Sequence, residues 1–268
     1  SSPLILISSK RILFKQMKLF KFKKDIKLIK FNNFGKTKIN NKSINLIDID
    51  NKLNNKNYLL DNNLYIKKCF DEAFKILKTK VTKKFINGPI NKTIFLNKKY
   101  PGITEYIAKK FNTSNVGMLI YNKKLSVCPI TTHFPIKLVS KKISKKLIKE
   151  KIVLINNFYK KNLGFKPNIG VTGLNPHCES VLKYNEDKRI IYPAVNELKK
   201  AGLKVYGPYA ADTIFLRKNR EKYDVIVGMY HDQVLSPIKT LFEYDAINIT
   251  MGLPFIRVSP DHGPNQTM

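Results

Sequence analysis

Two of the chain's four histidines fall within one mostly apolar stretch, GMYHDQVLSPIKTLFEYDAINITMGLPFIRVSPDHG (Gly228–Gly263). The apolar run before His231 has the composition of a β-strand, and two further β-like runs end at His133 and His177. A single histidine at a strand end is most often a hydrogen-bonded structural residue, but here three share one local context. Open α/β sheets bind ligands at the carboxyl ends of their strands. The pattern therefore predicts a three-histidine site for a divalent metal with open coordination positions.

Apolar runs of β-like composition alternate with stretches of helical period along the chain. This alternation is typical of an α/β fold with a largely parallel sheet. We expect Gly164 and Gly202 to end two helices, Pro193 to begin one, and Asn51–Asn63 to be a flexible loop. The predicted strands are Leu4–Ser8, Lys84–Gly88, Val116–Tyr121, Leu125–Thr132, Asn168–Gly173, Lys204–Gly207, Val225–Tyr230 and Ile247–Met251, and the predicted helices are Leu64–Lys80, Ile143–Gly164 and Arg189–Gly202.

Basic residues outnumber acidic residues by 50 to 19, which gives a formal net charge of +31. Such a balance is found in proteins that bind nucleic acids or membrane surfaces. Here the lysines are scattered over every segment and accompany heavy use of Asn and Ile, which indicates a compositional bias of the genome rather than a selected polyanion surface. Single-strand binders also interleave aromatic residues with a local basic patch, and this chain does not. A nucleic-acid-binding protein therefore stands only as the alternative from another class, and we expect no specific nucleic-acid partner.

The cysteines indicate a reducing compartment. Cys69, Cys128 and Cys178 are widely spaced and odd in number, which argues against a disulfide framework or a zinc ribbon. No apolar run approaches the ~20 residues of a membrane span. The opening SSPLILISS reads as a strand, because no basic segment precedes it as in a signal peptide. We therefore expect a cytoplasmic protein with no membrane partner.

Several charged residues occupy unusual sequence contexts. Lys239 and Arg257 stand in mostly apolar sequence, where a charge is costly unless it reaches solvent, an ion-pair partner or a bound anion. A substrate phosphate or carboxylate would meet that need, and Arg can hold it with two hydrogen bonds. Asp232 is placed to orient the imidazole of His231 or to join a metal shell. Asp212 is either a helix N-cap or a second carboxylate for proton transfer.

Eight short motifs occur in one order, and together they resemble the 4-hydroxythreonine-4-phosphate dehydrogenase family of pyridoxal phosphate biosynthesis. The resemblance covers most of the chain from about Leu53 onward. It implies an isocitrate/isopropylmalate dehydrogenase-like fold, with two α/β/α domains and a cleft between them. It places the first domain at 1–110 plus 246–268, and the second domain, with the metal site and the dimer contact, at 111–245. The motifs are INGPINK (Ile86–Lys92), GITEY (Gly102–Tyr106), TTHFPI (Thr131–Ile136), GLNPH (Gly173–His177), GPYAADTIF (Gly207–Phe215), MYHDQ (Met229–Gln233), INITMGLPFIR (Ile247–Arg257) and DHG (Asp261–Gly263).

The resemblance also implies an activity. Members are NAD-dependent, metal-requiring enzymes that oxidise and decarboxylate 4-(phosphooxy)-threonine, and they are homodimers with an active site shared between subunits. NAD enters through the resemblance alone, because the chain has no G-x-G-x-x-G motif. The metal is zinc, magnesium, cobalt or manganese. The implied metal ligands are His133, His177 and His231, the implied substrate-binding residues are Thr104, Lys239, Asn248 and Arg257, and the catalytic candidates are Asp212 and Asp232.

Three departures from the family pattern bear on the function. The family's substrate-binding His-Thr pair reads Ile103-Thr104 here, and an isoleucine side chain donates no hydrogen bond. Cys178-Glu179-Ser180 replaces a Gly-rich A-G-E-G segment. The chain also lacks the family's first loop and last segment, so we expect a product trimmed at both ends, with NAD contacts that cannot be named. Ile103 favours the nearest alternative, a sister dehydrogenase for another phosphorylated hydroxy acid, such as a four-carbon phosphosugar acid.

Overall fold

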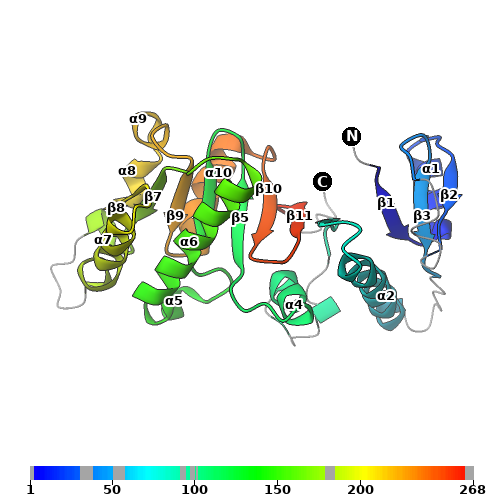
Figure 1. The fold of residues 1–268 in the computed structure, drawn as a ribbon, viewed down its shortest axis with the longest axis horizontal. Helices are drawn as coiled ribbons and strands as arrows, with labels where there is room; N and C mark the ends of the chain where they lie inside the picture. The colour runs from blue at the N-terminus through cyan, green and yellow to red at the C-terminus, as the bar shows by residue number, and fades with distance from the viewer. Residues whose placement is uncertain are drawn as a thin grey trace. The chain divides into compact units, whose positions relative to one another are not determined.

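The computed structural model describes residues 3–30, 39–50, 58–90, 95–96, 100, 102–178 and 185–262 (Figure 1). The chain packs as two units. Ser1–Phe85 with Thr93–Phe95 form the first unit, and Ile86–Lys92 with Leu96–Met268 form the second. The domain boundaries that the family resemblance implies stay a prediction. Every described candidate site residue belongs to the second unit.

The first unit contains a small parallel sheet. Its strands lie in the order β1 (Ile5–Ser8), β3 (Ile44–Asp48) and β2 (Ile26–Leu28), and β3 pairs in parallel with both neighbours. These short strands are rich in Ile, a β-branched residue that suits a pleated sheet. Helices α1 (Lys10–Leu19) and α2 (Tyr58–Lys78) complete the unit. Ile29, Ile47 and Ile76 form its buried cluster.

An eight-stranded sheet organises the second unit, and the division between the units falls within its edge strand β4. Half of this sheet is parallel: β6, β9, β7 and β8 pair in parallel. The other half is antiparallel, through the pairs β6–β5, β5–β10 and β10–β11. The strand order is β4 (Lys84–Ile86), β11 (Ile256–Pro260), β10 (Ile247–Met251), β5 (Gly117–Tyr121), β6 (Ser126–Pro129), β9 (Val225–Gly228), β7 (Ile169–Thr172) and β8 (Val205–Tyr209).

The α/β class is confirmed. The prediction of a largely parallel sheet is wrong for the antiparallel half, which contains β5, β10 and β11. The physical reason is the length of the connections. Only residues 122–125 join β5 to β6, which is too short for a crossover between parallel strands, so the two strands form a hairpin. Residues 252–255 likewise join β10 to the antiparallel strand β11.

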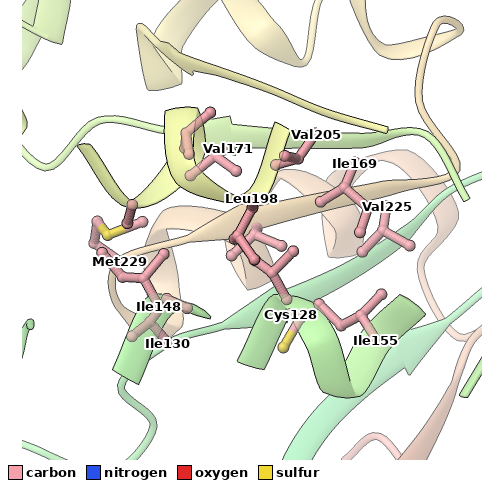
Figure 2. Packing of buried hydrophobic residues seen from close by; sticks show 14 of the residues in the cluster. Cys128, Ile130, Ile148, Ile155, Ile169, Val171, Leu198, Val205, Val225 and Met229 are labelled. Atoms are coloured by element: carbon pink, nitrogen blue, oxygen red, sulfur yellow. The ribbon is translucent and has the colours of Figure 1, made fainter. Parts of the chain in front are cut away.

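Helices cover both faces of the sheet. Helices α6 (Lys145–Asn162) and α7 (Tyr192–Lys200) contribute to the larger core on one face, and α10 (His231–Phe242) packs on the other. Leu119 and Ile120, which are consecutive in β5, belong to these two different cores, as the alternation of side chains along a strand requires. Figure 2 shows residues of the larger core, among them Cys128, Ile130, Ile148, Ile155, Ile169, Val171, Leu198, Val205, Val225 and Met229.

The structure contains most of the predicted elements, but several of them begin or end at residues other than the predicted ones. Gly164 and Gly202 follow α6 and α7 at φ values of 83° and 81°, in the left-handed region that favours glycine at helix ends. Pro193 stands in the first turn of α7, but it does not begin the helical run as predicted, because the π-helical turn η3 (Asp187–Ile191) leads directly into α7. The strand predicted over Val225–Tyr230 ends at Gly228, because α10 begins at His231.

The segment Asn51–Asn63 is not a loop throughout. Helix α2 begins at Tyr58, and the part of the predicted loop that precedes it lies outside the described residues. In the described part of the chain, none of the helices combines the length and the apolar character needed to cross a membrane.

Candidate active site

The three histidines follow three neighbouring parallel strands. His133 comes after β6, His231 is the first residue of α10 after β9, and His177 lies in the 3₁₀ turn η2 (Pro176–Cys178) after β7. Because β6, β9 and β7 are consecutive in the sheet and parallel, their carboxyl ends meet at one edge. The strand-end placement expected from the sequence is therefore found.

Two of the three imidazoles lie side by side. The ring centroids of His133 and His231 are 6.3 Å apart. Two imidazoles on one tetrahedral zinc, at about 2.1 Å from each nitrogen, place their centroids about 5 Å apart. The pair is therefore close to the spacing that a shared metal needs. Within the described ranges, however, no three His, Cys, Asp or Glu side chains gather closely enough to hold a metal, so the three-histidine site stays a prediction.

Asp232 orients one ring of this pair. Its Oδ1 lies 2.7 Å from Nδ1 of His231. With the proton on Nδ1, the ring donates to the carboxylate and leaves Nε2 unprotonated for a metal. His177 differs from the pair in its backbone: its φ of 57° is left-handed, a conformation that is uncommon for a non-glycine residue and recurs at functional sites.

A buried amide links two of the histidine-bearing loops. Gln233 is 8% exposed. Its Oε1 accepts from the backbone N–H of Met229 at 2.6 Å and from the hydroxyl of Thr172 at 2.9 Å, while its Nε2 donates to the carbonyl of Gly173 at 2.8 Å. The end of β9, before His231, is thus fixed to the end of β7, before His177.

Two further buried residues complete this support. The Thr131 hydroxyl donates to the carbonyl of Met229 at 2.7 Å, which joins the loop of His133 to the loop of His231. Asp187, 1% exposed, accepts from the backbone N–H groups of Leu174 at 2.7 Å and Asn175 at 3.2 Å. Neither of these residues, nor Gln233, was among the site residues predicted from the sequence. The MYHDQ motif contained a signal for Gln233, whereas Asp187 lies far from any quoted motif.

A second cluster surrounds Arg257, which is 3% exposed. Its guanidinium donates to Oδ1 of Asn87 at 2.8 Å, to the hydroxyl of Thr250 at 2.8 Å and to the hydroxyl of Thr104 at 3.4 Å. All three partners are neutral. Burial lowers the pKa of Arg257 to about 10, and the nearby charge of Glu105 opposes that shift. Arg257 is therefore a cation at neutral pH whose side-chain hydrogen bonds to described residues all go to uncharged oxygens.

The predicted substrate-binding residues lie along one face of β10 and β11. Thr250 is opposite Arg257 and Asn248 is opposite Ser259 in this pair. Ile249, between Asn248 and Thr250, belongs to the core on the α6 side, so its two neighbours point to the α10 side. Lys239, from α10, pairs with the buried carboxylate of Asp261, which follows β11. Asn248 Oδ1 is buried without a hydrogen-bond partner among the described residues.

Helix α4 (Ile103–Lys110) brings the two clusters together. Gly102, its N-cap, lies against His133: a Cβ built on Gly102 would be 3.3 Å from Cε1 of that ring. Two residues later, Thr104 contacts Arg257. Ile103, between them, is 5% exposed and part of the core. The first turn of α4 therefore spans from the histidine pair to the Arg257 cluster.

The remaining candidates are placed as follows. Asp212 is exposed in α8 (Ala211–Ile214), which follows β8, the strand next to β7. It is not the N-cap, which is Ala210, so the N-cap alternative is not found. Lys92, Glu179 and Ser180 lie outside the described residues.

Comparison with known proteins agrees with this geometry. The family model described as "Pyridoxal phosphate biosynthetic protein PdxA" matches residues 1–266. The 4-hydroxythreonine-4-phosphate dehydrogenase of Sulfurihydrogenibium sp. (strain YO3AOP1) is 42% identical over 198 residues, covering 72% of this chain and 61% of that protein. The D-threonate 4-phosphate dehydrogenase of Salmonella typhimurium is 36% identical over 199 residues, covering 73% of this chain and 61% of that protein. The chain thus matches 61% of the length of each of these two relatives.

Solved structures share the fold. The crystal structure of 4-hydroxythreonine-4-phosphate dehydrogenase from Klebsiella pneumoniae superposes with a TM-score of 0.81 at 29% identity, and the match covers 98% of this chain and 82% of that one.

Proposed function

The chain belongs to the pyridoxal phosphate biosynthetic protein PdxA family, and from this premise we propose that it is an NAD-dependent, metal-requiring dehydrogenase that oxidises and decarboxylates 4-(phosphooxy)-threonine. Relatives of the same family are named as dehydrogenases of phosphorylated four-carbon acids. The observation that carries the proposal is the buried Arg257, with neutral partners from three different elements of the second unit. A buried guanidinium without a directly bonded carboxylate suits a phosphate or carboxylate brought by a ligand.

We assign the binding of the substrate and the transfer of its proton to different side chains. Arg257 and Thr104 hold the substrate's anionic end, and Asn248 and Lys239 bind further polar groups along the same sheet face. The carbinol carbon of the substrate would give up its hydride to NAD, and the hydroxyl on that carbon would give up its proton to a carboxylate, for which Asp232 and Asp212 are the candidates. The resulting β-keto acid loses carbon dioxide.

The residues at the strand ends suit a divalent metal. His133 and His231 stand near the spacing of two ligands, and Asp232 fixes the tautomer of one ring. We propose that these two histidines and His177 hold zinc, magnesium, cobalt or manganese. The metal, when bound, supplies Lewis acidity that lowers the pKa of the substrate hydroxyl and stabilises developing negative charge.

A second candidate function is oxidation of a phosphorylated hydroxy acid without an amino group. Ile103 replaces the family's histidine beside Thr104, and a relative at 36% identity is named D-threonate 4-phosphate dehydrogenase. The two functions differ only in the substrate, so one assay with both compounds separates them.

The test is NADH formation by the 268-residue chain with added divalent metal, using 4-(phosphooxy)-threonine and D-threonate 4-phosphate in turn. We expect turnover with the first compound, and Arg257→Ala should lower kcat/KM at least about a hundredfold, since it removes charge-assisted hydrogen bonds. Arg257→Lys keeps the charge, and Arg217→Ala, at an exposed ion pair with Glu221, is the matched control. Turnover of neither compound would overturn the proposal, and so would an Arg257→Ala variant that is folded and fully active.

We also propose a homodimer with a shared active site and a cytoplasmic location. The shared site is supported by His177, which does not join the other two histidines within the described part of a single chain. The odd count and wide spacing of the three cysteines support a reducing compartment. Light scattering tests the dimer, and a monomer at micromolar concentration would contradict it.

A further inference from the structure

Two hydrogen-bond acceptors of the candidate site are buried without donors. Among the described residues, Oε2 of Glu105 and Oδ1 of Asn248 have no hydrogen-bond partner. A buried acceptor left unpaired costs about 1–3 kcal/mol, and more when it is charged. At a functional site, a bound ligand is one source of the missing donors.

Glu105 faces the part of the site where the histidines lie. It is the third residue of α4, and its side chain turns back toward Gly102. A Cβ built on Gly102 would lie 2.6 Å from Oε2 of Glu105 and 3.3 Å from Cε1 of His133. The carboxylate is therefore within a few ångströms of that imidazole. It is also near enough to Arg257 for its charge to raise the pKa of that residue.

The site thus combines a buried cation and a carboxylate that each lack a direct ionic partner. Arg257 donates only to neutral oxygens, and Glu105 has one oxygen with no donor. A ligand that complements both must carry an anionic group and a cationic hydrogen-bond donor. A phosphorylated amino acid has both groups, whereas a phosphorylated hydroxy acid has only a neutral hydroxyl in place of the ammonium.

We propose that Glu105 binds the ammonium group of the substrate and thereby selects an amino acid phosphate over the corresponding hydroxy acid. This inference rests on the function proposed above and names the residue that decides between its two candidate substrates. An ammonium–carboxylate contact adds the attraction between opposite charges to the hydrogen bond, whereas a hydroxyl–carboxylate hydrogen bond has a charge on the acceptor only. Glu105 therefore contributes more to binding the ammonium than to binding a hydroxyl.

A structural role for Glu105 has to be separated from this one. Glu at the third position of a helix is also the residue of a capping box, where it reaches back to the N-cap. Gln serves equally well in a capping box but carries no charge. Glu105→Gln therefore keeps the cap and removes only the proposed ionic contact. Glu221→Gln, which removes a carboxylate from an exposed ion pair, is the matched control.

The experiment measures kcat/KM for 4-(phosphooxy)-threonine and D-threonate 4-phosphate with the 268-residue chain and both variants, with melting temperatures recorded alongside. Glu105→Gln should lower kcat/KM for the amino acid roughly ten- to a hundredfold, the effect of one charge-assisted hydrogen bond. For the hydroxy acid, kcat/KM should fall clearly less than for the amino acid, because its neutral hydroxyl can still donate to the amide oxygen of Gln and loses no attraction between opposite charges. The control should change neither.

An equal loss for both compounds, or no loss, would overturn the inference, since an ionic contact to the ammonium must discriminate between them. Failure of the proposed function is a distinct result, in which the unchanged chain forms no NADH from either compound. Calorimetric titration of the two compounds into the unchanged chain and Glu105→Gln then decides the inference on binding alone. Selective weakening of the amino acid supports it, and any other pattern refutes it.

Discussion

Arg257 and Lys239 are both cations in apolar sequence, but they differ in their bonding partners. Lys239 pairs with a carboxylate of the chain itself, Asp261, whose side chain is 1% exposed. Arg257 is fully surrounded and bonds only to Asn87, Thr104 and Thr250. Burial lowers its pKa to about 10, which still leaves it charged at pH 7. Arg257 is thus the better anchor for an incoming anion, because the charge of Lys239 is already paired with Asp261.

At the residue scale, Ile103 offers a test of the departure from the family pattern. It lies between Gly102, against His133, and Thr104, against Arg257. We expect Ile103→His to lower the KM for 4-(phosphooxy)-threonine about ten- to a hundredfold, since a charge-assisted hydrogen bond contributes roughly 1.5–3 kcal/mol. Because Ile103 is buried, the same change should lower the melting temperature. Ile103→Leu is the control, and a KM that is unchanged or higher in the histidine variant would show that this chain anchors phosphate elsewhere.

Cys128 should lower the stability of the folded protein as the pH becomes alkaline. Burial raises the pKa of its thiol from 9.0 to about 12. Between these values the unfolded chain loses the thiol proton and the folded chain keeps it, so the stabilisation present below pH 9 is lost as the pH rises toward 12. The free energy of unfolding should fall by at most about 1.4 kcal/mol per pH unit from this group. Urea titrations of the unchanged chain and Cys128→Ala from pH 8 to 10.5 should show a shallower fall in the variant, and parallel curves would refute the assignment.

At the scale of elements, Gln233 connects the ends of β9 and β7. Gln233→Met removes the connection at similar volume. It leaves the N–H of Met229 and the carbonyl of Gly173 unpaired, so the free energy of unfolding should fall by about 1–3 kcal/mol for each buried group. Because both loops carry a proposed metal ligand, affinity for zinc or cobalt should also fall, by about ten- to a hundredfold.

The control for this prediction is Asn122→Ala. Asn122 is also buried and bonds to Asp245 and to the N–H of Lys124, but it lies in the β5–β6 turn, away from the strand ends that bear histidines. It should lose comparable stability while the metal affinity of the folded protein stays unchanged. If calorimetry finds equal metal affinity in Gln233→Met and in the unchanged chain, Gln233 is a structural residue only.

The sequence predicted the elements whose pattern is local. The Ile247–Met251 strand and the long helix α6 are found nearly as predicted, because alternation and helical period are read within one segment. The strands β2, β3 and β11 were not predicted, and neither were α1, α4 and α10. Helix α10 contains Pro237 and starts directly at His231, so its sequence reads as an interrupted apolar run.

The sequence motifs named residues that the structure places together, but the roles of these residues stay predictions, and the motifs did not identify the residues that support them. Thr104 and Arg257 do contact each other, although 153 positions separate them. Gln233, Asp187 and Glu105 were missed because their roles depend on burial and on partners distant in the chain. An unpaired carboxylate oxygen is a property of packing, and nothing in a linear pattern specifies packing.

At the scale of the whole molecule, the positions of the histidines predict which pairs of His→Ala variant subunits should recover activity when they are mixed. His133 and His231 lie side by side in one chain, and His177 does not join them within the described residues. If the dimer completes the site with the partner's histidine, mixing His177→Ala with His133→Ala subunits should restore part of the activity. Mixing His133→Ala with His231→Ala should restore none, because every site in that mixture lacks one of the two histidines of the pair. Restoration in the second mixture would show that these two histidines serve different sites.

The net charge of +31 belongs to the molecule as a whole rather than to one patch. Acidic residues make exposed ion pairs on several helices, as Asp71 does in α2, Glu197 in α7 and Glu221 beside α9 (Arg217–Arg220). Hydrogen bonds from Lys145 and Lys149 hold the pKa of Glu197 at about 2. Exposed pairs of this kind contribute little to stability. A lysine excess that is spread along the sequence favours a diffuse positive field over a single groove or stripe that would fix a nucleic acid in register.

This distribution leads to a prediction about DNA. Affinity for duplex DNA should be weak, independent of sequence and lost steeply as salt is raised, because it arises from counterion release alone. Lys239→Ala and Arg257→Ala should each lower turnover strongly and leave DNA affinity nearly unchanged, since each removes one charge of many. Fluorescence anisotropy with several duplexes from 50 to 200 mM salt, beside the NADH assay, measures both properties. Sequence-specific binding at about 150 mM salt, together with no NADH formation from either phosphorylated acid, would replace the enzyme with a nucleic-acid-binding protein.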